Sequence, residues 1–244
     1  MWKYIVQKTG KYIVLLLAAT LVIYLILDLA PGDPAKVILG KPVIYLYPEE
    51  ATEVSVELDV AGEMICTYPA YKDGWQVIAH PDGTLIDGEG KTYTCLFWEA
   101  EGENTFDFSK GFCIPGADTA AFLEESLTVL GLNARERNEF IIYWLPRMEG
   151  NPYNFIAFQN EAYTDQAELN ITPQPDSLLR VFMAWKPLDK AVDIEPQEFT
   201  PFVRQGFTAV EWGGAEITNR EQNAHIPQEY GHFCGLSTGF ELST

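Results

Sequence analysis

VSVELDV at residues 54–60 alternates apolar and polar side chains, and this alternation decides the class of fold that we expect. Side chains two positions apart point to the same face of a strand, so Val54, Val56, Leu58 and Val60 predict one buried face. Further strand-like runs surround this segment and are separated by turns rich in Gly, Pro and Asp. They are VIYLYP (43–48), MICTYP (64–69), WQVIAH (75–80) and TYTCLFWE (92–99). The pattern over residues 42–110 predicts an antiparallel meander or a small sandwich.

Two helical segments are expected after these strands. The first ends near Gly131, and the second begins after Asn133, because Glu136 three residues on completes a capping box. Pro146 is expected to end the second helix. Strand-like runs then resume, and they are NFIAFQ (154–159), AELNIT (167–172), LLRVFMAW (178–185) and FTAVEW (207–212). The order of strands, helical hairpin and strands predicts an α+β domain, mostly antiparallel β with one helical hairpin.

An uncharged apolar segment lies near the N-terminus, where residues 12–27 read YIVLLLAATLVIYLIL. Extended as a helix to residue 30, it would span about 28 Å, close to the roughly 30 Å hydrocarbon core of a bilayer. Lys3, Lys8 and Lys11 precede the segment, and the positive-inside rule therefore puts the N-terminus in the cytoplasm. We predict a single transmembrane helix that anchors the chain in the lipid bilayer. A cleaved signal peptide is the alternative.

This topology predicts how the chain is divided. The predicted parts are a cytoplasmic basic end at 1–11, the transmembrane helix at 12–30, a linker at 31–41, an extracytoplasmic α+β domain at 42–214 and a flexible tail at 215–244. The expected location is therefore the cell membrane, crossed once, with the C-terminal domain outside the cytoplasm.

The composition limits the classes of partner. The chain carries 35 acidic and 16 basic residues, a formal net charge of −19 at pH 7. Nucleic-acid binding depends on neutralising phosphates with Lys and Arg, so nucleic acid is not expected as a partner. No phosphate-binding loop, C-x-x-C pair or standard metal-ligand spacing occurs, so neither a cofactor nor a metal site is predicted. The sequence leaves open whether Cys66, Cys95 and Cys113 form a disulfide or remain free thiols.

Carboxylates close in sequence to tryptophans form the first candidate site. Glycoside hydrolysis needs two carboxyl groups across the scissile bond, and aromatic side chains can support the sugar rings. The candidate catalytic residues are Glu99, Glu139 and Glu211. The alternative is that these carboxylates pair with Arg180, Arg204 or a tyrosine hydroxyl and stabilise the fold.

Aromatic side chains form the second candidate site. The candidate ligand-binding residues are Trp98, Trp144 and Trp212, together with Arg180. Their rings could line a groove for a glycan or a peptide. The alternative is that these tryptophans belong to the core, where large aromatic side chains most often pack.

The N-terminal segment also resembles a known family. MWKYIVQKTGKYIVLLLAATLVIYLILDLAPGDPAKVILG at 1–40 resembles the first transmembrane segment of the permease subunits of bacterial oligopeptide and dipeptide ABC transporters, most specifically in LAPGDPA at 29–35. Such permeases continue with several more membrane-spanning helices, and no later window of this sequence is apolar enough to be one. The resemblance therefore implies a borrowed anchor, or a fragment or fusion of a permease subunit.

A second resemblance covers residues 41–214. The strings that carry it are KPVIYLYP (41–48), LFWE (96–99), SKGF (109–112), EFIIYWLP (139–146), NPYN (151–154), RVFMAWKPL (180–188) and GFTAVEWGG (206–214). They resemble a family of uncharacterised bacterial proteins whose domain often begins with KPVIYLYP. This resemblance implies no particular activity.

The sequence therefore predicts a membrane-anchored extracytoplasmic domain that binds a cell-surface glycan or a peptide. A carboxylate-dependent glycan hydrolase is one alternative, and a fragment or fusion of a peptide ABC transporter permease is the other. Binding is favoured over catalysis because the sequence contains no recognisable arrangement of nucleophile, base and acid.

Overall fold

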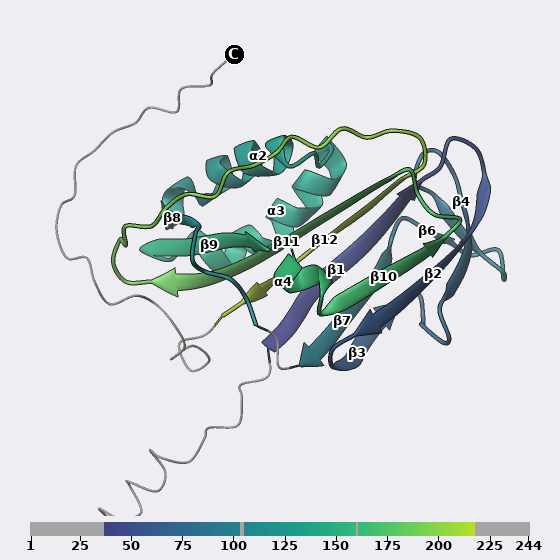
Figure 1. Ribbon diagram of the computed structural model, residues 1–244, viewed down its shortest axis with the longest axis horizontal. Coiled ribbons are helices and arrows are strands. Elements are labelled where there is room, and N and C mark those ends of the chain that lie inside the picture. The colour runs from purple at the N-terminus through teal and green to yellow at the C-terminus, as the bar shows by residue number, and fades with distance from the viewer. Residues whose placement is uncertain (1–36, 103–104, 160, 218–244) are drawn as a thin grey trace, which may run out of the picture. The chain divides into compact units, whose positions relative to one another are not determined.

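The computed structural model of the chain describes residues 37–102, 105–159 and 161–217. Two β-sheets pack face to face in this part of the chain, and a pair of helices covers part of the outer face of the larger sheet (Figure 1). The domain therefore has three layers, with the larger sheet in the middle. Each face of the larger sheet carries its own hydrophobic core.

The larger sheet has seven strands among the described residues, and it is mixed. In spatial order they are β3 (Glu63–Tyr68), β7 (Leu96–Gly102), β1 (Val37–Tyr47), β12 (Thr208–Glu216), β11 (Ser177–Leu188), β9 (Tyr153–Gln159) and β8 (Phe112–Pro115). The β11–β12 pair is parallel, while the other neighbouring pairs are antiparallel. Because β1 pairs with β7 and β12, strands from the two ends of the described chain meet near the centre of this sheet.

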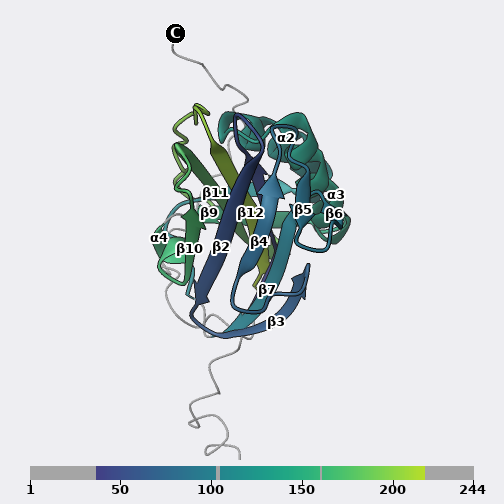
Figure 2. The same ribbon diagram turned by 90° about the vertical axis from the view of Figure 1, so that its right-hand side faces the viewer.

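The smaller sheet has five described strands, all paired antiparallel, and Figure 2 shows it in front of the larger sheet. In spatial order they are β10 (Ala167–Thr172), β2 (Thr52–Val60), β4 (Trp75–Ala79), β5 (Leu85–Asp87) and β6 (Thr92–Tyr93). The predicted strand VSVELDV is confirmed as part of β2. Its Val54 and Val56 are buried between the sheets, and Leu58 and Val60 pack at the edge of that core.

β7 also contributes alternate side chains to the core between the two sheets. Leu96, Trp98 and Ala100 are buried and point to the smaller sheet, whereas the residues between them are only half-buried. Alternate residues of a strand point to opposite faces, so the half-buried residues of β7 lie on the outer face of the larger sheet. This second face carries the site described below.

A helical hairpin covers the other core, as the sequence predicted. The helices are η1 (Gly116–Asp118), α2 (Thr119–Val129), α3 (Ala134–Met148) and the short α4 (Glu161–Thr164). The predicted capping box of α3 is confirmed, since the Asn133 side chain accepts from the Glu136 N–H and Glu136 accepts from the Asn133 N–H. The prediction that Pro146 ends α3 is wrong. Proline disturbs only the last turn here, and the helix continues to Met148.

A strap, residues 189–206, connects β11 to β12 without regular secondary structure. Parallel neighbours need such a crossover, because both strands must begin at the same end of the sheet. The strap's Phe199 packs edge-on against Phe158, with ring centroids 5.5 Å apart. Its Arg204 forms an ion pair with the buried Glu136 and donates a 2.8 Å hydrogen bond to the Gly131 carbonyl. These contacts fasten the strap to β9 and to the link between α2 and α3.

The predicted α+β class is wrong, although the helical hairpin is present. The described chain is mostly β, and its strands do not form separate groups before and after the helices. β1 and β7 join β11 and β12 in one sheet. The prediction followed the order of segments along the chain, whereas the strand pairing joins segments that lie far apart in the sequence.

The predicted single-pass membrane topology also needs correction. None of the helices within the described ranges is long and apolar enough to cross a membrane. Residues 1–11 and 12–30, predicted as the basic end and the transmembrane helix, lie outside those ranges. β1 begins at Val37, so the end of the predicted linker at 31–41 is strand, and β12 extends into the predicted tail at 215–244. The prediction was based on the apolar length of residues 12–30 alone. The described domain contains no helix that could span a membrane.

Candidate functional site

Lys41 lies at a β-bulge in β1. The pairing register with β12 shifts between Gly40 and Val43, and the register with β7 shifts between Leu39 and Val43. Lys41 also has a φ of 51°, in the left-handed region that residues other than Gly rarely adopt. Such a conformation costs about 1–3 kcal/mol and persists only where the surrounding structure imposes it. A bulge re-aims the side chain it carries, and here the Lys41 side chain reaches the aromatic rings beside α3.

Gly213 of β12 makes room for this bulge, and the neighbouring Gly214 makes room for Trp144 of α3. A Cβ atom on Gly213 would lie 3.0 Å from the Pro42 Cα, and one on Gly214 would lie 2.7 Å from both the Met183 carbonyl oxygen and the Trp144 ring. A larger residue at 213 would collide with β1 at Pro42, and one at 214 would collide with β11 and with the Trp144 ring of α3. Pro42 of KPVIYLYP and Gly213 of GFTAVEWGG therefore pack directly against each other where β1 meets β12.

The Lys41 ammonium is held over aromatic rings. Its Nζ lies 4.6 Å from the ring centroid of Tyr143 and 5.5 Å from that of Trp212. Burial lowers the pKa of Lys41, and the charges of Glu139 and Glu99 oppose this shift only in part. No described residue accepts a hydrogen bond from Nζ or forms an ion pair with it. All three donors of this ammonium are therefore available to a ligand.

Two carboxylates flank the ammonium. Glu99 on β7 accepts a 3.2 Å hydrogen bond from the Lys41 backbone N–H. Glu139 on α3 accepts from the Tyr45 hydroxyl and pairs with Arg135 Nε at 3.1 Å. Burial together with the Glu139 carboxylate raises the pKa of Tyr45 far above its usual value, so this phenol stays protonated as a donor. We call Lys41, Tyr45, Glu99, Glu139 and Tyr143 the Lys41 site.

Arg147 stands at the exposed rim of the Lys41 site. Its guanidinium carbon lies 4.3 Å from the centroid of the Tyr143 ring, and one guanidinium nitrogen donates to the Tyr143 carbonyl. Its positive charge contributes to the lowered pKa of Lys41. No carboxylate of the described residues forms an ion pair with Arg147.

The site continues onto the outer face of β3 and β7, which α3 leaves open. Cys66 of β3 lies beside Glu99 of β7, and Tyr68 lies beside Phe97. Cross-strand neighbours share a face, so these four side chains point to the same side as Val43 of β1. Tyr68 is 65% exposed. An exposed aromatic ring thus stands on the same sheet face as the Lys41 site.

The three candidate catalytic carboxylates divide into two groups. Glu99 and Glu139 both face Lys41, although they lie on different elements. Glu211 lies on the opposite face of the larger sheet, between the two sheets. There it pairs with Arg180 Nε at 2.6 Å and accepts a 3.1 Å hydrogen bond from Trp98 Nε1. Glu211 is therefore a structural residue that pairs with Arg180, which was the alternative to a catalytic role.

The candidate ligand-binding tryptophans belong to the core. Trp98, Trp144 and Trp212 are 0%, 3% and 0% exposed, so none of them offers a ring face to a ligand. The Arg180 side chain is 10% exposed and donates to Glu211 and to the Ala167 carbonyl. The sequence positions of the three tryptophans were consistent both with ligand binding and with core packing. Their deep burial shows that they pack in the core.

Sequence reasoning missed Lys41 and Arg147. The signal for Lys41 was present, because a lysine opens an otherwise apolar run at KPVIYLYP. A charge without a partner within a central strand needs a special environment. Arg147 is an exposed position with no distinguishing spacing, and only the packing of α3 against β1 brings it near Lys41.

The cysteines and potential metal ligands add no further site. Cys66, Cys95 and Cys113 are free thiols, and burial raises the pKa of Cys95, which disfavours its reactive thiolate. Within the described ranges, no group of three or more His, Cys, Asp or Glu residues is arranged to hold a metal ion.

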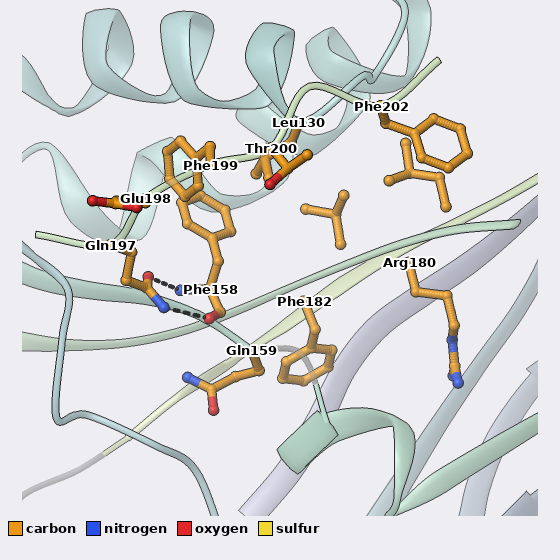
Figure 3. Close-up of a pocket in the computed structure, with 12 residues that line it drawn as sticks. Leu130, Phe158, Gln159, Arg180, Phe182, Gln197, Glu198, Phe199, Thr200 and Phe202 are labelled. Carbon is orange, nitrogen blue, oxygen red and sulfur yellow. Dashed lines mark hydrogen bonds between the residues drawn. The ribbon is translucent and has the colours of Figure 1, made fainter. Parts of the chain in front are cut away.

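A separate cavity of about 220 Å³ lies under the strap, on the outer face near β9 and β11 (Figure 3). Its walls combine aromatic side chains, among them Phe158, Phe199 and Phe202, with polar ones such as Gln197 and Glu198. The Gln197 side chain closes one end by accepting from the Phe158 N–H and donating to the Phe158 carbonyl, both at 2.8 Å. This amide takes the place of a neighbouring strand at that edge of β9.

The fold and the site together define a class: a two-sheet β-sandwich with a helical hairpin on one face and a lysine-centred polar site beside it. No family model and no solved structure matches the chain. The chain is 44% identical over 77 residues to an uncharacterised protein in the bglA 3' region of Butyrivibrio fibrisolvens, which corresponds to 30% of this chain and 74% of that protein. The chain belongs to the same family as that protein.

Proposed function

We propose that this protein binds a carbohydrate at the Lys41 site and on the adjoining outer face of β3 and β7. The observation that carries the proposal is the half-buried Lys41 ammonium, which lies over Tyr143 and Trp212 with no described hydrogen-bond acceptor. Because Lys41 is half-buried, its ammonium is only partly solvated, and no described side chain competes with a ligand for its donors. A ligand oxygen can therefore replace water and accept a charge-assisted hydrogen bond from Nζ.

A sugar matches the mixture of groups at this site. Each hydroxyl can donate to a carboxylate such as Glu99 and accept from a cation such as Lys41. The apolar face of a sugar ring can pack on the exposed ring of Tyr68. A peptide ligand is the other candidate, but its backbone offers fewer groups that both donate and accept. The site therefore favours a carbohydrate over a peptide.

Binding fits the carboxylates better than hydrolysis does. A glycosidase needs one protonated carboxyl group as its acid and a second, ionised one. Glu139 is paired with Arg135 through one carboxylate oxygen and accepts from the Tyr45 hydroxyl through the other, so this side chain is built into the fold and is not left free for proton transfer. Incubation of the chain with oligosaccharides, followed by a reducing-end assay, tests this choice. Release of new reducing ends that disappears in Glu99→Gln would replace the binding proposal with a hydrolase.

The binding proposal is tested by titration calorimetry of the full chain against a panel of neutral and acidic oligosaccharides. Lys41→Met and Tyr68→Ala are expected to weaken binding about tenfold each, which corresponds to roughly 1.4 kcal/mol. Ile142→Ala is the matched control, because Ile142 is 73% exposed on α3 and forms no part of the site. Absence of binding to every oligosaccharide, or an equal loss in the control, would overturn the proposal.

A further inference from the structure

Two cations share one aromatic ring at the edge of the Lys41 site. Lys41 Nζ and the Arg147 guanidinium carbon lie 4.6 and 4.3 Å from the centroid of the Tyr143 ring. Neither forms an ion pair with a described residue. By contrast, five other basic side chains of the described chain do pair with carboxylates, and they are Lys91, Lys110, Arg135, Arg180 and Arg204. Lys186 also lies over aromatic rings without an ion pair to a described residue, so the distinctive feature of the Lys41 site is that two such cations share one ring.

The charges around Lys41 do not balance. Lys41, Arg135 and Arg147 are positive, and Glu99 and Glu139 are negative, which leaves one positive charge in excess among these described residues. The chain as a whole has a net charge of −19, so this local excess runs against the composition. A single anionic group would complete the balance and relieve the repulsion between the two cations.

The donors that remain free suit a carboxylate. Lys41 has three N–H donors, none of which is used by a described residue, and Arg147 uses one of its nitrogens on the Tyr143 carbonyl. A carboxylate has two oxygens and can accept from an ammonium and a guanidinium at once. Arg147 is exposed, so a ligand can approach from the solvent side of Tyr143.

We propose that the carbohydrate bound at the Lys41 site is acidic, a uronic acid or an oligomer of one, and that its carboxylate lies between Lys41 Nζ and the Arg147 guanidinium. This inference rests on the proposed carbohydrate site. It adds the substrate class, and it assigns Arg147 a role as a ligand-binding residue. Glu99 and Glu139 then contact the hydroxyl groups of the same sugar.

The test compares oligogalacturonate with its methyl ester, because the ester removes the charge and keeps the sugar. Titration calorimetry of the full chain is expected to give about tenfold tighter binding of the acid, the value of one charge-assisted hydrogen bond. In both Lys41→Met and Arg147→Gln this preference is expected to disappear. Lys91→Gln is the control, since Lys91 is an exposed lysine paired with Glu89 at a turn.

Each outcome of this comparison decides one point. Equal binding of acid and ester would overturn the inference and leave the carbohydrate site standing. Equal loss of the preference in Lys91→Gln would also overturn it, because general attraction by surface charge would then explain the effect. Absence of binding to the acid, the ester and a neutral oligosaccharide alike would overturn the proposed function itself. Circular dichroism of each variant checks that the fold is retained.

Discussion

Replacing Glu211 by Leu is expected to destabilise the domain strongly, because Glu211 is a structural residue in this fold. Its side chain is 1% exposed and holds Arg180 Nε at 2.6 Å and Trp98 Nε1 at 3.1 Å. Leucine would leave the buried Arg180 charge without a counter-ion and the Trp98 N–H without an acceptor.

The size of this effect follows from the two lost contacts. Breaking a buried ion pair by removing one partner costs about 3–5 kcal/mol, because the remaining charge stays buried. Glu211→Gln can still accept from Trp98, so its loss is expected to be smaller, about 2–3 kcal/mol. The whole stability of a domain is about 5–15 kcal/mol, and a change of this size is readily measured.

Urea unfolding of the full chain, followed by tryptophan fluorescence, provides the assay. The double variant Arg180→Leu with Glu211→Leu is the control, since it removes both charges from the core. It is expected to be considerably more stable than Glu211→Leu alone, as found when a buried pair is replaced by apolar side chains. A loss below about 1 kcal/mol in Glu211→Leu would refute the reasoning, because a paired buried carboxylate cannot be removed so easily.

Four further predictions concern the bulge and the strap. Lys41→Gly is expected to raise the unfolding free energy by about 1 kcal/mol, since glycine adopts a positive φ without strain, while oligosaccharide binding is lost; thermal unfolding and calorimetry check both. The stability of the natural chain relative to Lys41→Met is expected to rise with pH towards 10.5, because the lowered pKa means that the unfolded chain binds more protons in this range; urea unfolding across pH measures it. Gly214→Ala is expected to cost about 1–3 kcal/mol by overpacking, whereas Gly88→Ala, whose Cβ would meet nothing within 4 Å, serves as the unaffected control in the same assay. Gln197→Ala is expected to speed hydrogen exchange at the Phe158 amide, and unchanged exchange there would contradict the assigned contact.

Local features of the fold were predictable from the sequence. The alternation in β2 and the capping box of Asn133 and Glu136 depend on residues within a few positions of one another, and both are confirmed. The pairing of β1 with β12 was not predictable in this way. Val43 lies opposite Trp212, and a single sequence carries no signal that links two such distant strands. The fold class was predicted wrongly because the sequence does not show which distant strands pair.

The candidate site was predictable only in part. Glu99 and Glu139 were named from their neighbouring tryptophans, and both do face Lys41. The tryptophans themselves turned out to be core residues, because alternation places Trp98 on the inner face and Glu99 on the outer face of the same strand. The bulge that aims Lys41 at this face packs its Pro42 against Gly213 of β12, which is far away in the sequence.

The position of β1 between β7 and β12 has a consequence for how the protein is made. Val43 emerges from the ribosome long before its partner Trp212. At about 5–20 residues per second, β1 waits roughly 8–35 s for that strand. During this interval one edge of an apolar strand has no partner, and exposed edges readily pair with other chains. The centre of the larger sheet can therefore close only after β12 has been synthesised, and until then β1 has β7 as its one neighbouring strand in this sheet.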